Sequence, residues 1–148
     1  MQIGFSAANI TPSYGMERPG GTGKAYINGV HDDCLASAAY IGDGDSAIAI
    51  VGLDTLSVPH SVCDAAREII VDAIDLPPER VMFGASHTHT SGPIAAGFIS
   101  AVNQDYAAHV ARQAATAVID AQRRAEELMV GVGTGEALDV AHPRRWHL

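Results

Sequence analysis

One segment in the first half of the chain constrains the fold more than any other. Residues 47–53 form an apolar run without alternation, which is typical of a strand covered on both faces. Apolar side chains then recur at helical spacing over residues 62–73, and Pro77 and Pro78 end that helix before a second apolar strand at residues 80–85. A strand, a helix and a second strand in this order form a β-α-β unit, whose two strands run parallel in one sheet.

The other elements are predicted from the same kinds of pattern. They are a strand at residues 2–10, a strand at 34–41, a helix at 104–126 with Asn103 as its N-cap, and a last strand at 128–138. The turn GDGD at residues 42–45 joins strand 34–41 to strand 46–53 as an antiparallel hairpin. We therefore expect an α/β fold: a mixed β-sheet, built from the antiparallel hairpin and two β-α-β crossovers, with helices packed on it and residues 1–148 in a single domain.

Composition argues against several classes of protein. The 148 residues are 47% hydrophobic and 18% charged, which is ordinary for one globular domain. The net charge of -8 argues against a nucleic-acid partner. No segment approaches the roughly 20 apolar residues of a membrane span, and residues 1–12 lack the basic start of a signal peptide. Cys34 and Cys63 are expected to be free thiols in a reducing compartment, so we expect a cytoplasmic protein.

A pair of histidines follows the second strand of the β-α-β unit. His87 and His89 are two residues apart, and in an extended segment such residues point the same way. Both imidazoles can then face a single point, which is what a divalent metal ion needs from two nitrogen ligands. The alternative is a pair of loop histidines that are hydrogen-bonded to their surroundings.

Strand direction brings further polar residues to the same edge of the sheet. The β-α-β unit places Asp54 beside the loop that carries His87 and His89, which we call the histidine loop. The hairpin places His31 and Asp32 beside Asp54. The second crossover is expected to bring residues 139–145, including Arg144, to that edge as well.

Ligand sites in open α/β sheets form at the carboxyl ends of parallel strands. We therefore expect one shared site built from these side chains: His31, Asp32, Asp54, His87, His89 and Arg144. Three alternatives stay open. Asp54 could cap the following helix or turn, His31 and Asp32 could form a surface turn, and Arg144 could be solvated.

The glycine-rich loop at residues 13–30 contains RPGGTGK, which invites comparison with a phosphate-binding loop. Arg18 stands where that motif has its first glycine, and Ala25 follows Lys24 where the motif has serine or threonine. A phosphate-binding role is therefore excluded. A loop of this length in a compact domain is more often functional than idle.

Four stretches of the sequence resemble one protein family. They are NITP at residues 9–12, GVHDDCLASAAYI at 29–41, GLDTLSV at 52–58 and SHTHTSGP at 86–93. In order and spacing they are similar to the amino-terminal part of the neutral/alkaline non-lysosomal ceramidases and their bacterial relatives. The resemblance implies hydrolysis of the N-acyl amide of ceramide with a zinc ion, which that family holds by two histidines, a glutamate and a tyrosine.

The same resemblance implies roles for individual residues. His87 corresponds to the first zinc ligand, and His89 to the histidine that lies by the metal and the scissile amide. Arg144, in HPRR, stands where the family has an arginine that helps to hold the substrate. The chain departs from the family at Asn9, where the family has aspartate, and at Pro143, where it has asparagine.

The resemblance predicts a zinc-dependent amide hydrolase of the neutral ceramidase type, which converts N-acylsphingosine or a related N-acyl amide to fatty acid and amine. The family's other zinc ligands lie farther along than residue 148, so the site is expected to be incomplete and to need a homo-oligomer or a further carboxyl-terminal segment. The chain's own stand-ins for those ligands would be His89, His142, Glu136 and Tyr106. The alternative is a non-catalytic, truncated or diverged ceramidase-like domain that binds metal weakly or binds a partner chain.

Overall fold

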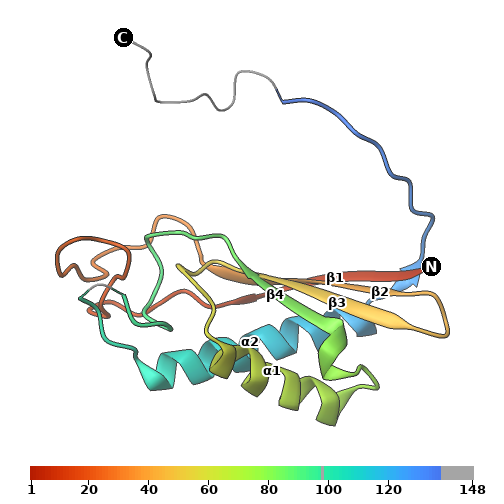
Figure 1. Cartoon of the computed structure of the whole chain (residues 1–148), viewed down its shortest axis with the longest axis horizontal. Coiled ribbons are helices and arrows are strands. Elements are labelled where there is room, and N and C mark those ends of the chain that lie inside the picture. The colour runs from red at the N-terminus through yellow and green to blue at the C-terminus, as the bar shows by residue number, and fades with distance from the viewer. Residues whose placement is uncertain (98, 138–148) are drawn as a thin grey trace.

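The computed structural model describes residues 1–97 and 99–137 (Figure 1). Its strands are β1 (Gln2–Asn9), β2 (Leu35–Gly42), β3 (Ala47–Leu53), β4 (Val81–Ala85) and β5 (Glu126–Glu127). Its helices are α1 (His60–Ala73), the short 3-10 helix η1 (Pro78–Arg80) and α2 (Gln104–Arg123). Among these described residues, none of the helices combines the length and the apolar character that crossing a membrane requires.

The five strands form one mixed sheet in the order β4-β3-β2-β1-β5. β2 pairs antiparallel with both β1 and β3, whereas β3 and β4 pair parallel. Both α1 and α2 pack against the same face of the sheet, as Figure 1 shows. The predicted α/β class, the antiparallel hairpin and the β-α-β unit are therefore confirmed.

Helix α2 begins where the sequence indicates and packs closely on the sheet. The side chain of Asn103 accepts a hydrogen bond from the main-chain nitrogen of Tyr106 at 2.9 Å, as an N-cap does. Alanines line the buried side of α2, and small side chains allow a short distance between helix and sheet. A Cβ at Gly4 on β1 would overlap the carbonyl of Ala121, so glycine is required where β1 crosses this helix.

The predicted last strand and the second β-α-β crossover are wrong. Of residues 126–137, only Glu126–Glu127 form a strand, and this strand pairs antiparallel with the start of β1. Since β1 and β4 run in the same direction, β5 is antiparallel to β4 as well, so α2 does not join two parallel strands. The Leu128 nitrogen donates to the Met1 carbonyl at 2.8 Å. Residues 128–137 therefore leave at the edge of the sheet opposite the histidine loop.

Strand β3 is covered on one face only, which corrects the expectation of cover on both. Ala49, Val51 and Leu53 are buried against the helices. Ile48 and Ile50 alternate with them and are 43% and 38% exposed, because both helices lie on the other face of the sheet. We call this uncovered side the outer face.

Candidate functional site

The histidine loop and Asp54 leave the sheet at the same edge, as strand direction predicts. Leu53 at the end of β3 is in register with Ala85 at the end of β4, and the Ser86 nitrogen donates to the Leu53 carbonyl at 2.9 Å. Asp54 itself has a structural role in the sheet. Its carboxylate accepts a hydrogen bond from the main-chain nitrogen of Leu35 at 3.0 Å, which holds the start of β2 beside the end of β3.

His87 is held in an uncommon backbone conformation. Its φ of 61° makes it the one non-glycine residue with a left-handed backbone in the described part of the chain. Such residues cost about 1 to 3 kcal/mol and cluster at functional sites. The Nδ1 atom lies 2.7 Å from the carbonyl oxygen of Leu56. Because a carbonyl oxygen can only accept, Nδ1 carries the proton, and Nε2 keeps the lone pair that a metal ion needs.

The second imidazole meets the first at its Nε2 atom. His89 Nε2 lies 3.4 Å from His87 Nε2, and the ring centroids are 5.0 Å apart with the ring planes at 80°. Two nitrogens bound tetrahedrally to one zinc ion at the usual bond length lie about 3.4 Å apart. The separation suits two ligands of one metal ion, and it is also a hydrogen-bond distance between the two rings, as in the alternative of hydrogen-bonded loop histidines. The rings face each other although His87 has a left-handed backbone in place of the extended one expected from the sequence.

The loop after the histidines is fixed to the core by Gly92. A Cβ at Gly92 would overlap the ring of Tyr106 and lie 2.9 Å from Cβ of Pro12. The Tyr106 hydroxyl donates a hydrogen bond to the Ile10 carbonyl, and burial raises the pKa of Tyr106. Because this hydroxyl is buried and already bonded, Tyr106 does not serve as a stand-in ligand. Tyr106 instead packs in the hydrophobic core.

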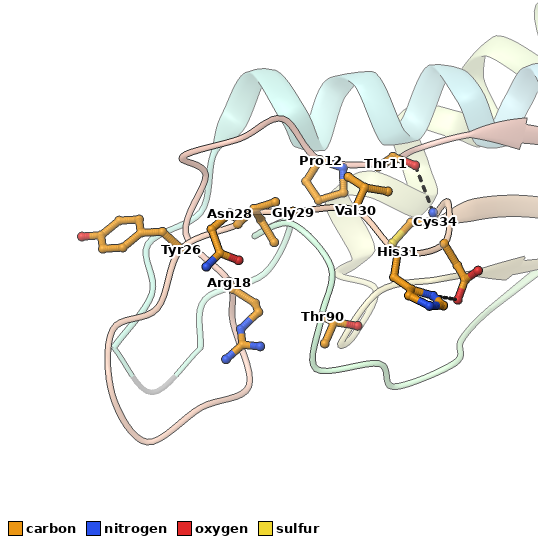
Figure 2. A pocket seen from close by; sticks show the side chains of 12 residues that line it. Thr11, Pro12, Arg18, Tyr26, Asn28, Gly29, Val30, His31, Cys34 and Thr90 are labelled. Atoms are coloured by element: carbon orange, nitrogen blue, oxygen red, sulfur yellow. Dashed lines mark hydrogen bonds and ion pairs between the residues drawn. The ribbon is translucent and has the colours of Figure 1, made fainter.

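His31 and Asp32 lie apart from the two facing imidazoles and contact each other. His31 Nδ1 is 2.8 Å from an Asp32 carboxylate oxygen, and both side chains are almost fully exposed. With Arg18, Asn28 and Thr90 they line a cavity of about 280 Å³ (Figure 2). Thr90 follows His89 directly, so the cavity opens beside the histidine loop.

The structure thus brings two sets of predicted residues together, His87 with His89 and His31 with Asp32. Within residues 1–97 and 99–137, no further histidine, cysteine, aspartate or glutamate joins either pair to make a group of three that could hold a metal ion. Glu136 lies on the segment that leaves at the opposite edge. The other named residues, His142 and Arg144, lie outside the described residues.

Two parts of this arrangement could not be predicted from the sequence, the Leu56 carbonyl and the close packing of Gly92. Leu56 contributes a main-chain atom, which no side-chain pattern marks. Gly92 lies within SHTHTSGP, but only the fold shows that the Tyr106 ring rests on it.

The structure defines an α/β protein with two facing imidazoles at the carboxyl edge of its mixed sheet. No protein-family model matches the sequence, and no curated protein matches it. Among solved structures, neutral ceramidase from Pseudomonas aeruginosa shares the fold with a TM-score of 0.68 and 19% sequence identity, over 84% of this chain. A structure described as ceramidase complexed with C2 gives a TM-score of 0.66 and 19% identity over 84% of this chain.

The chain spans only 22% and 21% of the length of these two structures. At this level of identity the likeness establishes a shared fold. It confirms the resemblance to neutral ceramidases that the sequence stretches indicate.

Proposed function

We propose that the chain forms part of a zinc-dependent amide hydrolase of the neutral ceramidase type, which acts on N-acylsphingosine or a related N-acyl amide. The observation that carries the proposal is the 3.4 Å separation of the two Nε2 atoms, on a loop at the carboxyl edge of a sheet shared with neutral ceramidases. His87 and His89 would hold the ion. Arg144 would help to hold the substrate, a role that rests on the resemblance.

A bound zinc ion supplies a Lewis acid for the amide carbonyl and a water molecule with a pKa of about 7. The chain's own residues prepare that chemistry. The Leu56 carbonyl accepts the proton on Nδ1 of His87, which leaves the lone pair of Nε2 for the proposed metal ion. The cavity beside Thr90 offers Arg18 and Asn28 to the polar end of a lipid amide.

We also propose a cytoplasmic location. It is supported by the two cysteines, Cys34 and Cys63, which are both free thiols. Since the described residues bring two ligand nitrogens together, a complete site would take its remaining ligands from a second chain or from a further carboxyl-terminal segment.

A second candidate function is a non-catalytic ceramidase-like domain that binds metal weakly or binds a partner chain. The observation that favours it is that residues 1–97 and 99–137 bring together no group of three or more side chains that could hold a metal ion. In that case the fold would be kept without hydrolysis.

Zinc binding by the purified chain, with its intact mass verified, tests the proposal. Equilibrium dialysis should find one zinc ion per chain, and X-ray absorption of the loaded protein should show two imidazole nitrogens bound to the metal. Zinc that is absent, or bound without imidazole, would reject the metal site and favour the second candidate.

A further inference from the structure

The glycine-rich loop folds into a short two-stranded ribbon, which we define as residues 15–27. The main chain of Ile27 bonds to Gly15 and to Met16, each at 2.8 Å, and Arg18 bonds to Ala25 at 2.8 Å. The tip of this ribbon carries the glycines of RPGGTGK, for which the proposed function above gives no role.

Gly20, near the tip of the ribbon, packs directly against the imidazole of His89. A Cβ at Gly20 would lie 2.7 Å from Cγ, 2.8 Å from Nδ1 and 3.0 Å from Cβ of His89, distances at or below the limit that real Cβ atoms keep. Gly20 also has a φ of 95°, a conformation that glycine adopts at no steric cost. The Cα of Gly20 therefore covers the Nδ1 side of the ring.

The two histidines are held by different means. A hydrogen bond to the Leu56 carbonyl fixes His87 through its Nδ1. His89 has Gly20 against its Nδ1 side and His87 3.4 Å from its Nε2. Gly20 lies so close that there is no room between it and the ring for a side chain.

We propose that Gly20 is a positioning residue for His89, and that the ribbon acts as a brace that keeps His89 Nε2 directed at His87 Nε2. The inference rests on the proposed metal site and deepens it. The residues of RPGGTGK thereby gain a role, because only a residue without a side chain allows the main chain to lie against the ring.

The brace is itself anchored by Glu17. One carboxylate oxygen of Glu17 lies 2.9 Å from the Lys24 ammonium across the ribbon, and the other accepts a hydrogen bond from the Ala101 nitrogen at 2.9 Å. Ala101 belongs to the segment that follows the histidine loop. The ribbon and that segment are thus linked, which keeps Gly20 in place beside His89.

The test compares Gly20→Ala with Gly44→Ala in the full 148-residue chain. Gly44 lies in the turn between β2 and β3, outside the ribbon, and has a φ of 101° with open space around its Cα, so its substitution imposes the same kind of backbone strain without touching His89 or the ribbon. Because residues that orient metal ligands typically contribute 10- to 100-fold to metal affinity, Gly20→Ala should weaken zinc binding by about that factor. Gly44→Ala should leave zinc affinity near that of the wild type.

A readout without metal separates this inference from the metal site. In the zinc-free chain, a nuclear Overhauser effect should connect the Gly20 α-protons with the His89 β-protons. Gly20→Ala should shift the imidazole nitrogen resonances of His89 and leave in place those of His109, whose ring lies beside Tyr106 on α2. If these changes occur and the wild type binds no zinc, the metal site fails while the contact stands. Unchanged His89 resonances in Gly20→Ala would overturn the inference.

The double variant Gly20→Ala/His89→Ala guards against a trivial loss of folding. Without the imidazole there is room for the new methyl group, so the double variant should bind zinc as His89→Ala alone does. A further loss of affinity in the double variant, beyond that of His89→Ala, would mean that Gly20 acts through something other than His89 and would also overturn the inference.

Discussion

The hydroxyl of Tyr106 donates a hydrogen bond to the main-chain carbonyl of Ile10, which lies 96 residues earlier in the chain. Gly92 rests on the same ring. Two of the stretches that carry the resemblance, residues 9–12 and 86–93, therefore meet on the first turn of α2. This contact fixes the base of the loop that presents His87 and His89.

Gly92→Ala should destabilise the fold, because its methyl group would overlap the Tyr106 ring. Overpacking of a well-packed core typically costs about 1 to 3 kcal/mol, and we expect a loss of that size in the free energy of unfolding measured with urea. Gly29→Ala is the matched control, since a Cβ at Gly29 meets no atom within 4 Å. Equal stability of the two variants would contradict the packing role of Gly92.

His87→Ala should abolish tight zinc binding, and His109→Ala should leave it unchanged. Of these two residues, His87 has its Nε2 directed at a second imidazole, whereas His109 lies partway along α2 with its ring 6.3 Å from that of Tyr106. Zinc titration against a competing chelator measures the difference. If both variants retain zinc equally, the ligand assignment of His87 is wrong.

The sequence predicts well the parts of the fold that depend on local pattern. The strands that start at Gln2, Leu35, Ala47 and Val81 lie within a residue or two of their predicted places, and Asn103 caps α2 as expected. Parallel pairing of β3 and β4 then follows from chain topology, and with it the common edge of Asp54 and the histidine loop.

The errors concern relationships between distant segments. Whether residues 128–137 form a strand depends on a partner that is distant in sequence, since the neighbouring strand β5 pairs with the start of β1. The apolar run in β3 indicates that both faces can be buried, but it does not indicate what would cover them. Gly20 and His89 are far apart in sequence, so no local pattern reveals that they touch.

Acid should release the anchor at Glu17. Its hydrogen bonds with Lys24 and with the Ala101 nitrogen lower the pKa of Glu17 from its ordinary value of 4.5. A lowered pKa in the folded state means that the ionised group stabilises the fold above pH 4.5 and loses that effect as the pH falls through the lowered value. The melting temperature of the wild type should therefore exceed that of Glu17→Gln at neutral pH, and the difference should vanish in acid.

Glu79→Gln provides the control for this comparison, since Glu79 lies exposed in η1. Its effect on the melting temperature should be small at every pH. A difference between wild type and Glu17→Gln that grows as the pH falls would refute the anchor, because the sign of the pKa shift allows only a decrease.

The outer face should cause self-association at high concentration. The β-strand register places Phe5, Ala39, Ile50 and Met82 in one uncharged row across it, and Phe5 and Met82 are 64% and 60% exposed. Exposed apolar patches of this kind mark interaction surfaces. Met82→Lys should therefore shift the chain toward monomer in sedimentation velocity runs over a range of concentrations.

Val71→Lys is the matched control for the outer face, because Val71 is 46% exposed on α1 and lies on the covered side of the sheet. It adds the same charge at a different surface. If the two lysine variants change the association equally, net charge rather than the outer face governs it.

The purified 148-residue chain should show little or no amidase activity on N-acylsphingosine, even with zinc added. Catalytic zinc typically has three protein ligands and one open position, and its ligands must be held within about half an ångström to work. The described residues bring two nitrogens together, and Tyr106 is committed to the core. Fatty-acid release, measured with and without a chelator, tests this expectation. Robust chelator-sensitive release would contradict it, and would mean that residues of this chain complete the site without a second chain or a further segment.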